Sequence, residues 1–474
     1  MTSTTFDLII IGGGPAGYTA AIRAAQLGIK TAVVEKRSTL GGTCLNVGCI
    51  PSKAMLESSE HYVQAKNKFA KHGILISDLK LDLSTMLKRK DTVVRQLTQG
   101  IAGLFKKHGI TYIQGFGSLI GQEGNQKLVQ VAAADGSGTV QHFKAEKILL
   151  STGSEPTELP FLKFDGKKII SSTEALELTQ VPEHLLVVGG GVIGLEMGSV
   201  WARLGAKVTV IEFQDRLVPG MDKQASEELR KALSKQGLEF KFQHKCLGST
   251  FLPDGKIELH AETQGQPVKF VGDVVLVATG RRPFSDRLGL ESLGIEKDKA
   301  GRVTVDAHFQ TKVPGVYAVG DLIAGPMLAH KAEEEGVAAV EIMAGIPGHV
   351  NYNAIPNVIY TWPELASVGF TEEELKDKQI SYKAGVYPFL ANGRARTMDE
   401  IEGFVKILAD SKTDRILGAH IIGPRASDLL QEITSVIEFG GSAEDVARTC
   451  HAHPTLSETV KEAALAVDKL QRNF

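Results

Sequence analysis

The sequence predicts an α/β fold with two Rossmann-like domains, the second inserted in the first, followed by a C-terminal α+β domain. Three observations predict it. A strand–glycine–helix pattern occurs twice, a strand ending in Thr-Gly occurs twice, and β-rich segments followed by amphipathic helices begin near residue 351. A chain of 474 residues exceeds one ordinary domain. We place the first domain at 1–150, continued by 281–350, the second at 151–280, and the third at 351–474.

The two glycine patterns have the same layout. Each has an apolar strand, a turn with glycines at its first, third and sixth positions, a helical stretch, and an acid ending the next strand. In the first copy these residues are Gly12, Gly14, Gly17 and Glu35, and in the second copy they are Gly189, Gly191, Gly194 and Glu212. Two such copies are a far more specific signal than one.

Each position in this pattern has a physical reason. The first glycine permits a tight turn, the second lets a pyrophosphate approach the backbone, and the third lets helix and strand pack. The helix N-terminus attracts phosphate, and the acid accepts hydrogen bonds from ribose hydroxyls. The alternative is two glycine turns without a ligand. Glu212 has no arginine beside it for a 2′-phosphate, which favours NAD over NADP.

The Thr-Gly stretches predict the insertion. Apolar strands run into Thr152–Gly153 and into Thr279–Gly280, and the whole second glycine pattern lies between them. The first domain is then expected to resume near Arg281. A further apolar run within 315–323 is expected to place Asp321 close to the dinucleotide. The spacing fits an acid on a surface loop equally well.

Composition limits the class of protein. Hydrophobic residues make up 43%, the net charge is -2, and no basic run predicts binding to nucleic acid or to an anionic membrane. No apolar stretch is long enough to span a bilayer. The run at 6–17 lacks a basic flank and is broken by glycines, so it is not a signal peptide. Cytoplasm is the expected location, and a processed form in the mitochondrial matrix would look the same.

Cys44 and Cys49 lie close together in GGTCLNVGCIPSK. No metal site is predicted: zinc needs a second pair of ligands, and a plant-type iron–sulfur site needs a cysteine where Ser52 stands. A disulfide is the better interpretation, with two reduced packing cysteines as the alternative. Residues five apart on a regular helix point about 140° apart, so we expect the backbone to bend at Gly48.

A strained disulfide in a short loop is easily reduced, which suits a redox catalyst. Lys53 and the helix expected after Cys49 would both favour a thiolate. Cys246 and Cys450 are isolated and have no role that the sequence supports, and we predict that both are buried packing residues.

The segment CHAHPTLSE near the C-terminus supplies a candidate base. Thiol–disulfide exchange needs a group that takes a proton from the attacking thiol and returns it, and histidine titrates in the right range. His453 would act as this base, and Glu458 would orient its ring. Histidines ahead of a helix are also common as surface or capping residues, so the sequence alone leaves both interpretations open.

With these motifs assembled, the chain resembles the pyridine nucleotide–disulfide oxidoreductases from end to end. The resemblance covers GGGPAG, GGTCLNVGCIPSK, GGGVIGLEMG, ATGRRP, VYAVGD, YTWPELASVG and HAHPTLSE. It is strongest to the dihydrolipoamide dehydrogenase branch. Glutathione reductases usually read Val-Pro-Lys-Lys after the second cysteine, mercuric reductases add a C-terminal cysteine pair, and the soluble transhydrogenases lack the paired cysteines.

The resemblance implies FAD binding by 1–150 with 281–350, NAD binding by 151–280, and dimerisation through 351–474. It places Lys53 near the flavin, paired with Glu196. The remaining cofactor-binding residues that it implies are Gly117, Thr152, Gly153, Asp321 and Gly280.

The resemblance also implies the reaction. His453, positioned by Glu458, would deprotonate dihydrolipoamide, whose thiolate attacks the disulfide at Cys44 and leaves Cys49 as a thiolate beside FAD. Electrons would then reduce NAD. In this family the histidine serves the other subunit, so an obligate homodimer is expected. Expected partners are lipoyl-domain proteins and the acyltransferase core of 2-oxo-acid dehydrogenase complexes, or the glycine cleavage complex. A reductase of another disulfide and a redox-silent docking protein are the competing hypotheses.

Overall fold

The computed structural model describes residues 4–134 and 137–472, which form two compact units. Unit 1 comprises Met1–Ala54, Ser84–Thr157 and Gly280–Val350, and unit 2 comprises Met55–Leu83, Glu158–Thr279 and Asn351–Phe474. Most of the first predicted domain falls in unit 1, and most of the other two falls in unit 2. The three-domain division therefore stays a prediction, whereas the α/β fold class is confirmed by the sheets described below.

Unit 1 is built on a seven-stranded sheet. Its strands in spatial order are β3 (Thr111–Gln114), β2 (Thr31–Glu35), β1 (Thr4–Ile11), β6 (Val140–Leu150), β5 (Gln126–Ala132) and β4 (Phe116–Glu123), and β17 (Val316–Ala318) pairs with β6. β1, β2, β3, β6 and β17 pair in parallel, whereas β4 and β5 are antiparallel. The continuous apolar run of β1 is buried, as expected for a strand in the middle of a parallel sheet.

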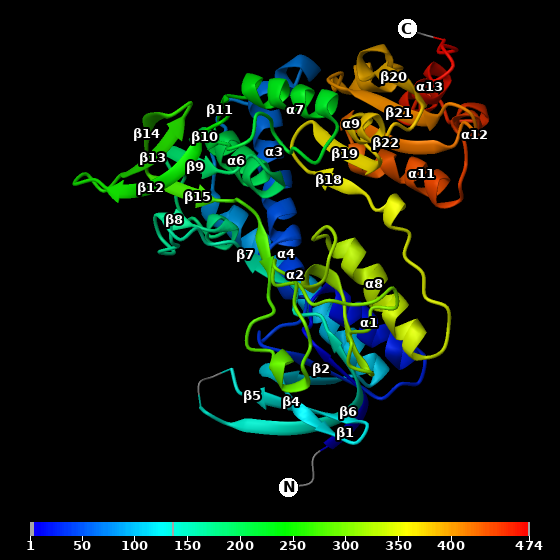
Figure 1. Cartoon of the computed structure of the whole chain (residues 1–474). Helices are drawn as coiled ribbons and strands as arrows, with labels where there is room; N and C mark the ends of the chain where they lie inside the picture. Colours follow the sequence, from blue (N-terminus) through cyan, green and yellow to red (C-terminus); the bar gives the residue numbers. More distant parts are fainter. Residues whose placement is uncertain (1–3, 135–136, 473–474) are drawn as a thin grey trace. The chain divides into compact units, whose positions relative to one another are not determined.

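Two helices lie side by side in unit 1 (Figure 1). α1 (Pro15–Gln26) packs on β1 and β2, and α8 (Ala329–Met343) packs on α1. The other helical elements that begin in this part of the chain are α2 (Gly42–Val47), α3 (Cys49–Asn67), α4 (Leu83–His108), η2 (Leu290–Leu293) and η3 (Gly320–Leu322).

The chain leaves unit 1 and returns to it through a pair of short strands. β7 (Ser154–Pro156) pairs antiparallel with β16 (Arg281–Pro283), and the Thr157 N–H donates to the Gly280 carbonyl at 3.1 Å. The segment between these strands contains the second glycine pattern. The point where the chain leaves after β7 and the point where it returns before β16 therefore lie beside each other, at one end of this two-stranded ribbon.

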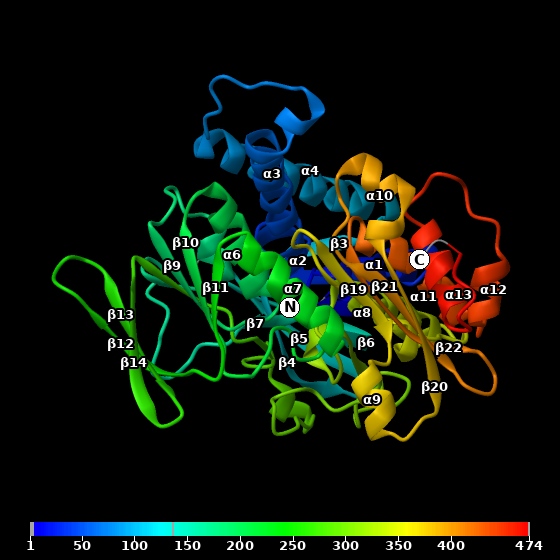
Figure 2. The same ribbon diagram turned by 90° about the horizontal axis from the view of Figure 1, so that it is seen from above.

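Unit 2 contains a five-stranded parallel sheet with the order β11-β10-β9-β15-β8. Its strands are β8 (Ile169–Ile170), β9 (His184–Val188), β10 (Lys207–Ile211), β11 (Leu238–Lys241) and β15 (Val274–Val277). The helices of this part are α5 (Ser172–Ala175), α6 (Val192–Leu204) and α7 (Lys223–Lys235). A separate antiparallel ribbon, seen in Figure 2, is formed by β12 (Lys245–Phe251), β13 (Ile257–Thr263) and β14 (Gln266–Gly272).

The C-terminal part of unit 2 is an antiparallel sheet with the order β18-β19-β22-β21-β20. Its strands are β18 (Asn357–Ile359), β19 (Glu364–Gly369), β20 (Tyr382–Pro388), β21 (Phe404–Asp410) and β22 (Ile416–Gly423). Its helices are α9 (Glu372–Asp377), α10 (Gly393–Met398), α11 (Ala426–Glu438), α12 (Ala443–Arg448) and α13 (Glu458–Ala466). α11 packs on β19 and β22, and α13 packs on β20 and β21. This arrangement is an α+β fold, as the sequence predicts.

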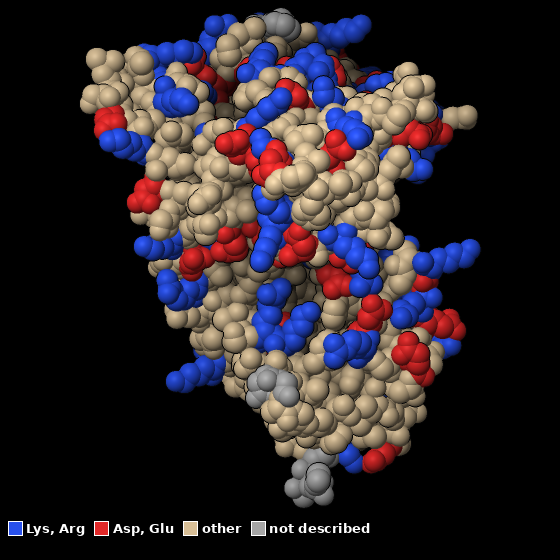
Figure 3. Space-filling model, turned by 90° about the vertical axis from the view of Figure 1, so that its left-hand side faces the viewer, with Lys and Arg blue, Asp and Glu red and all other residues tan. Residues whose placement is uncertain are grey.

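Charged side chains of both signs are interspersed on the face shown in Figure 3. Along the residues that the structure describes, no helix is both long and apolar enough to cross a membrane.

Candidate active site

The two glycine turns have closely matching geometry. Gly12 and Gly189, the first glycine of each turn, have φ of 113° and 110°, a backbone conformation that side chains disfavour. A Cβ on Gly17 would lie 1.9 Å from the Gly12 carbonyl oxygen, and one on Gly194 would lie 2.2 Å from that of Gly189. Only glycine allows each helix to approach its turn this closely.

The middle glycine of each turn leaves room for a ligand: within the described chain, a Cβ on Gly14 would meet only Gly42 Cα, at 3.7 Å. Gly14 and Gly191 are the N-cap residues of α1 and α6, and neither helix has a side-chain cap. A Cβ on Gly191 would meet no atom of the described chain within 4 Å. Uncapped N–H groups beside open space suit an anion at a helix N-terminus. The residues present therefore fit the pyrophosphate of a dinucleotide at both turns.

Glu35 and Glu212, the acids predicted to bind ribose, each accept a hydrogen bond from the backbone of their own glycine turn. Glu35 is buried and accepts hydrogen bonds from the N–H groups of Gly13 at 2.8 Å and Arg37 at 2.9 Å. Glu212 is buried and accepts from Gly190 at 2.5 Å and Gln214 at 2.7 Å. A carboxylate has about four lone-pair positions, so each acid retains capacity for a hydroxyl donor.

The cysteine pair lies across a break between two helices. Cys44 is on α2, which ends at Val47, and Cys49 begins α3. The predicted bend at Gly48 is confirmed, and a Cβ there would approach the Thr43 carbonyl oxygen to 2.9 Å. Cys44 and Cys49 are hydrogen bonded to each other as thiols and are not joined in the structure. The disulfide therefore stays a prediction. Cys246 is buried, as predicted, whereas Cys450 is exposed, so the prediction that it is buried is wrong.

The first glycine turn and the cysteine pair are adjacent. The Gly41 N–H donates to the Gly13 carbonyl at 2.8 Å. A Cβ on Gly42 would lie 2.6 Å from the Gly14 Cα. The helix that carries Cys44 therefore starts directly against the turn expected to bind a dinucleotide.

The surroundings of Cys44 favour its protonated form. The pKa of Cys44 is raised by its hydrogen bond with Cys49, by burial, and by the negative charges of Cys49 and Glu333. The charge of Lys53 acts in the opposite direction. Cys49 starts α3, where the helix dipole stabilises negative charge. The protonated form of Cys44 is therefore favoured, and a negative charge on the sulfur at the start of α3 would be stabilised by the helix.

Asp321 lies in η3 and accepts a hydrogen bond from Ser154 Oγ at 2.5 Å. Arg281 donates to Ser154 Oγ and to the Ser154 carbonyl, both at 2.7 Å. Burial lowers the pKa of Arg281, and the charges of Asp321, Cys49 and Glu155 oppose this effect. The guanidinium is therefore within electrostatic reach of both Asp321 and the cysteine pair.

Sequence reasoning missed Arg281 and Ser154 as site residues. Their only signal was their position, directly after the two Thr-Gly stretches. It also missed Tyr18, which follows Gly17 and donates to Glu333 at 2.8 Å.

The other predicted cofactor residues occupy defined positions. Gly117 lies on β4, where a Cβ would come within 3.0 Å of Val34 Cγ1. Thr152 Oγ1 donates to the Phe284 carbonyl at 2.7 Å, and the Gly153 carbonyl accepts from the Phe284 N–H at 2.8 Å. Gly280 precedes β16. The contacts of Thr152 and Gly153 join the segment that leads out of unit 1 to the segment that returns to it.

Lys53 and Glu196 fall in different units. Lys53 lies on α3 in unit 1. Glu196 is buried on α6 in unit 2 and accepts from the Tyr360 N–H at 3.0 Å. Their predicted pairing stays a proposal.

His453 and Glu458 form the predicted base–orienter pair. Their Nδ1 and Oε1 atoms are 2.9 Å apart, and Glu458 Oε2 accepts from the Thr455 N–H at 2.8 Å. Burial raises the pKa of Glu458, but the bond from Thr455 and the contact with His453 outweigh it, so the pKa lies below its ordinary value. The His453 side chain is 78% exposed. An ionised, fixed carboxylate therefore orients an accessible imidazole.

His451 differs from His453. Its side chain is 5% exposed, its Nε2 lies 2.7 Å from Glu432 Oε1, and its Nδ1 lies 3.0 Å from the Thr449 carbonyl oxygen. Both ring nitrogens are engaged within the fold, so His451 is structural and His453 is the candidate base.

Comparison with known proteins identifies the family. Residues 6–336 match the family described as pyridine nucleotide-disulphide oxidoreductase, and residues 355–464 match the dimerisation domain of the same family. The chain belongs to this family. As a pyridine nucleotide-disulphide oxidoreductase it is an enzyme that uses FAD and NAD, and its C-terminal part is a dimerisation domain.

Individual relatives are similar over nearly the whole chain. Dihydrolipoyl dehydrogenase 1, mitochondrial, of Arabidopsis thaliana is 52% identical over 461 residues, which cover 97% of this chain and 90% of that protein. A leghemoglobin reductase of Glycine max is 50% identical and covers 97% and 87%. The solved structure of LpdA from Mycobacterium tuberculosis has a TM-score of 0.89 at 28% identity and covers 97% and 99%.

Proposed function

We propose that this oxidoreductase oxidises dihydrolipoamide carried on a lipoyl protein and reduces NAD. It would act as a homodimer within 2-oxo-acid dehydrogenase or glycine cleavage complexes. The observation that carries the proposal is the cysteine pair across the Gly48 break, against the first glycine turn. The oriented His453–Glu458 pair supports it. The names of relatives at 52% and 53% identity support the substrate.

In the proposed reaction the protein starts with a Cys44–Cys49 disulfide. His453 takes a proton from one thiol of the substrate, and the resulting thiolate attacks the Cys44 sulfur. A mixed disulfide forms, the Cys44–Cys49 bond breaks, and Cys49 leaves as a thiolate at the start of α3. The second substrate thiol then displaces Cys44, which leaves as a thiolate and takes the proton that His453 holds. The proton of the second substrate thiol passes to the freed imidazole. Lipoamide leaves oxidised, and the cysteine pair holds the two electrons.

The chain's own residues would hold the cofactors at two places. Gly12, Gly14, Gly17 and Glu35 would bind the FAD pyrophosphate and ribose, with Asp321 and Lys53 nearer the flavin, and the second glycine turn with Glu212 would bind NAD. Bound FAD and NAD supply a path by which the two electrons of the cysteine pair reach nicotinamide as a hydride.

The compartment and the partners are part of this proposal. Similar proteins from Arabidopsis thaliana and Homo sapiens are named as mitochondrial. The mitochondrial matrix is therefore the location that the relatives support, and the cytoplasmic expectation from the sequence stays a prediction. The proposed partners are lipoyl domains and the acyltransferase core.

The proposal is tested by comparing substrates with purified, FAD-replete protein. We expect NAD reduction with dihydrolipoamide, and NADH oxidation with lipoamide far faster than with glutathione, mercuric ion or leghemoglobin. Absence of dihydrolipoamide oxidation would refute the proposed substrate. A higher kcat/KM for leghemoglobin would assign the chain to the activity named for the Glycine max relative.

The open space at Gly191 predicts a binding defect without a folding defect. Gly191→Ala places a methyl group where no described atom lies within 4 Å, on backbone with φ -82° and ψ -177° that alanine accepts. We expect an unchanged melting temperature and a dissociation constant for NAD raised about tenfold, equivalent to about 1.4 kcal/mol. Titration calorimetry measures the affinity. Gly103→Ala, also unobstructed, is the control and should leave NAD affinity unchanged.

A further inference from the structure

A buried lysine joins three elements of unit 2 that the reaction above does not use. Lys406 on β21 is 1% exposed, and its ammonium donates to Asp222 Oδ2 at 2.9 Å and to Glu372 Oε2 at 2.5 Å. The Asp222 side chain is fully buried. Removing one partner of such a pair leaves an uncompensated buried charge, which is costly. The group is therefore a fixed junction between the C-terminal sheet and the loop that precedes α7.

In this junction the positive and negative groups stabilise the ionised forms of one another. Burial lowers the pKa of Lys406, but its bonds to Glu372 and Asp222 raise it above the ordinary value. Burial raises the pKa of Glu372, yet its bonds to Lys376, Lys406 and Tyr382 bring it to about 2. Burial raises the pKa of Asp222, but His420, Lys406 and the Ala225 N–H bring it below its ordinary value. The lysine and both carboxylates are thus ionised at neutral pH.

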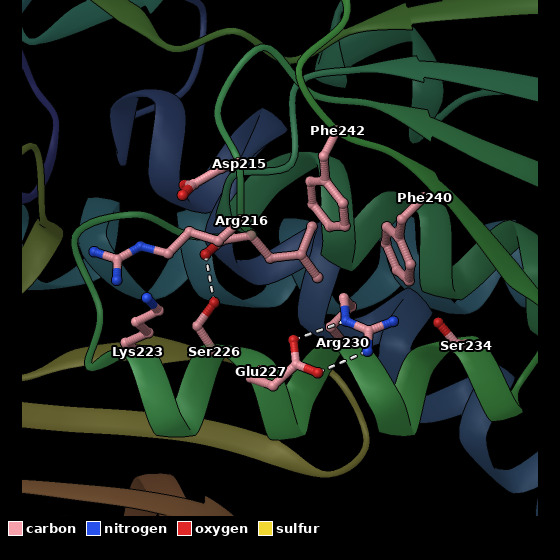
Figure 4. A pocket seen from close by; sticks show the side chains of 10 residues that line it. Asp215, Arg216, Lys223, Ser226, Glu227, Arg230, Ser234, Phe240 and Phe242 are labelled. Atoms are coloured by element: carbon pink, nitrogen blue, oxygen red, sulfur yellow. Dashed lines mark hydrogen bonds and ion pairs between the residues drawn. The ribbon is translucent and has the colours of Figure 1, made fainter.

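Asp222 connects this junction to the start of α7. Its Oδ1 accepts the N–H groups of Gln224 at 3.1 Å and Ala225 at 3.2 Å, so it is the N-cap of the helix. One turn later, Ser226 Oγ donates to the Leu217 carbonyl at 2.6 Å (Figure 4). The helix therefore holds the loop 213–221 that runs from the end of β10 to its own start.

That loop in turn supports the second glycine turn. The Val218 N–H donates to the Gly190 carbonyl at 3.1 Å. Leu217 Cδ2 lies only 2.9 Å from where a Cβ on Gly190 would be. The Gly190 N–H is the group bonded to Glu212. The loop thus contacts the peptide that joins the NAD turn to its ribose acid.

The loop packs through Leu217, Val218 and Met221, which are buried, and it borders a pocket on its other side. A pocket of about 480 Å³ lies beneath it, bordered by Asp215 and Arg216 of the loop, by the exposed face of α7, and by Phe240 and Phe242 (Figure 4). The loop is held by the packing of its buried residues together with its hydrogen bonds to Gly190 and Ser226. The bond to Ser226 depends on the position of α7.

We propose that Lys406 is a positioning residue for NAD: through Asp222 and α7 it holds the loop 213–221, and thereby Gly190 and Glu212, in the geometry that binds the dinucleotide. This inference rests on the proposed placement of NAD at the second glycine turn. Lys406 is buried, and its ammonium is bonded to Asp222 and Glu372. The thiol half of the reaction uses the cysteine pair with His453 and Glu458, and in the described chain Glu458 is bonded to His453 and to the Thr455 N–H, outside this junction.

The test separates the two halves of the reaction in the FAD-loaded enzyme. Lys406→Met should raise the dissociation constant and KM for NAD about tenfold, with kcat and the rate of flavin reduction by dihydrolipoamide without NAD unchanged. Ser226→Ala leaves every buried charge paired and should produce the same shift, and it keeps the test valid if Lys406→Met does not fold. Lys383→Met, on the neighbouring strand β20 and 44% exposed, is the matched control.

The double variant Lys406→Met/Ser226→Ala tests whether the two residues affect NAD binding through the same contacts. If Lys406 acts through α7 and Ser226, the combined NAD defect should equal the larger single defect and not the product of the two. Unchanged NAD affinity in both single variants overturns the proposal. Equal loss in both halves of the reaction overturns it as well, since it indicates a general loss of structure. The affinity for NAD is measured without dihydrolipoamide, so a wrong substrate assignment would leave this result intact.

Discussion

Cys49→Ser is expected to reduce dihydrolipoamide-dependent NAD reduction by about 10³-fold or more, because no thiolate can then form at the start of α3. A serine hydroxyl cannot complete the disulfide that the substrate thiolate attacks. The substitution is nearly isosteric, so FAD content and melting temperature should match the wild type. Stopped-flow and steady-state kinetics of the FAD-loaded proteins measure the loss.

A spectroscopic measurement distinguishes this cause from simple misfolding. Adding about one two-electron equivalent of dithionite anaerobically to the wild type should produce a long-wavelength absorption band from a thiolate beside oxidised flavin. Cys49→Ser should lack the band, whereas Cys44→Ser should retain a thiolate at Cys49. If the wild type bleached directly to reduced flavin, the cysteine pair would not be coupled to the flavin, and the proposed reaction would have to be abandoned.

His453→Gln is expected to lower kcat for dihydrolipoamide oxidation by about 10²- to 10⁴-fold, the usual contribution of a general acid–base group. The glutamine can still bond to Glu458 but cannot move a proton. The cysteine pair is untouched, so the absorption band produced by dithionite should persist. Glu458→Gln retains the base and loses only the ionised partner, so it should have a smaller effect. Loss of the band in His453→Gln would contradict a role confined to proton transfer.

A mixed dimer tests whether His453 serves the other copy of the chain. A dimer of one Cys49→Ser chain and one His453→Gln chain contains one fully intact site if the histidine acts across the dimer. It contains none if the histidine acts within its own chain. We expect about half of the wild-type activity from tagged, purified mixed dimers, and baseline activity would place the base in the same chain as its cysteines.

The sequence predicted the features that depend on neighbouring residues. The two glycine turns, in which Gly17 and Gly194 lie against the first glycine of the turn, follow from residue spacing within six positions. The helix break at Gly48 follows from the geometry of two cysteines five residues apart. The base–orienter pair of His453 and Glu458 is equally local. Local steric rules are sufficient for such features.

Long-range polar contacts were not predicted. Ser154 and Asp321 are 167 residues apart in sequence, and Lys406 and Asp222 are 184 apart. Lys406 stands on β21, whose residues from Phe404 to Ala409 are all buried. A lysine is rarely buried without a partner, and its burial here depends on two acids delivered by other elements. One sequence contains no periodicity that connects such residues, so their partners become visible only in the folded chain.

The pairing of β7 with β16 makes the whole segment from Glu158 to Thr279 equivalent to the loop of a hairpin. The two points where this segment leaves and rejoins unit 1 are hydrogen bonded to each other through Thr157 and Gly280. The entropy of closing a loop grows only slowly with its length, so a long segment costs little more than a short turn at this place. The seven-stranded sheet of unit 1 is therefore complete without this segment, whereas residues 351–474 depend on it for one bonding partner of Lys406 and for that of the Tyr360 N–H.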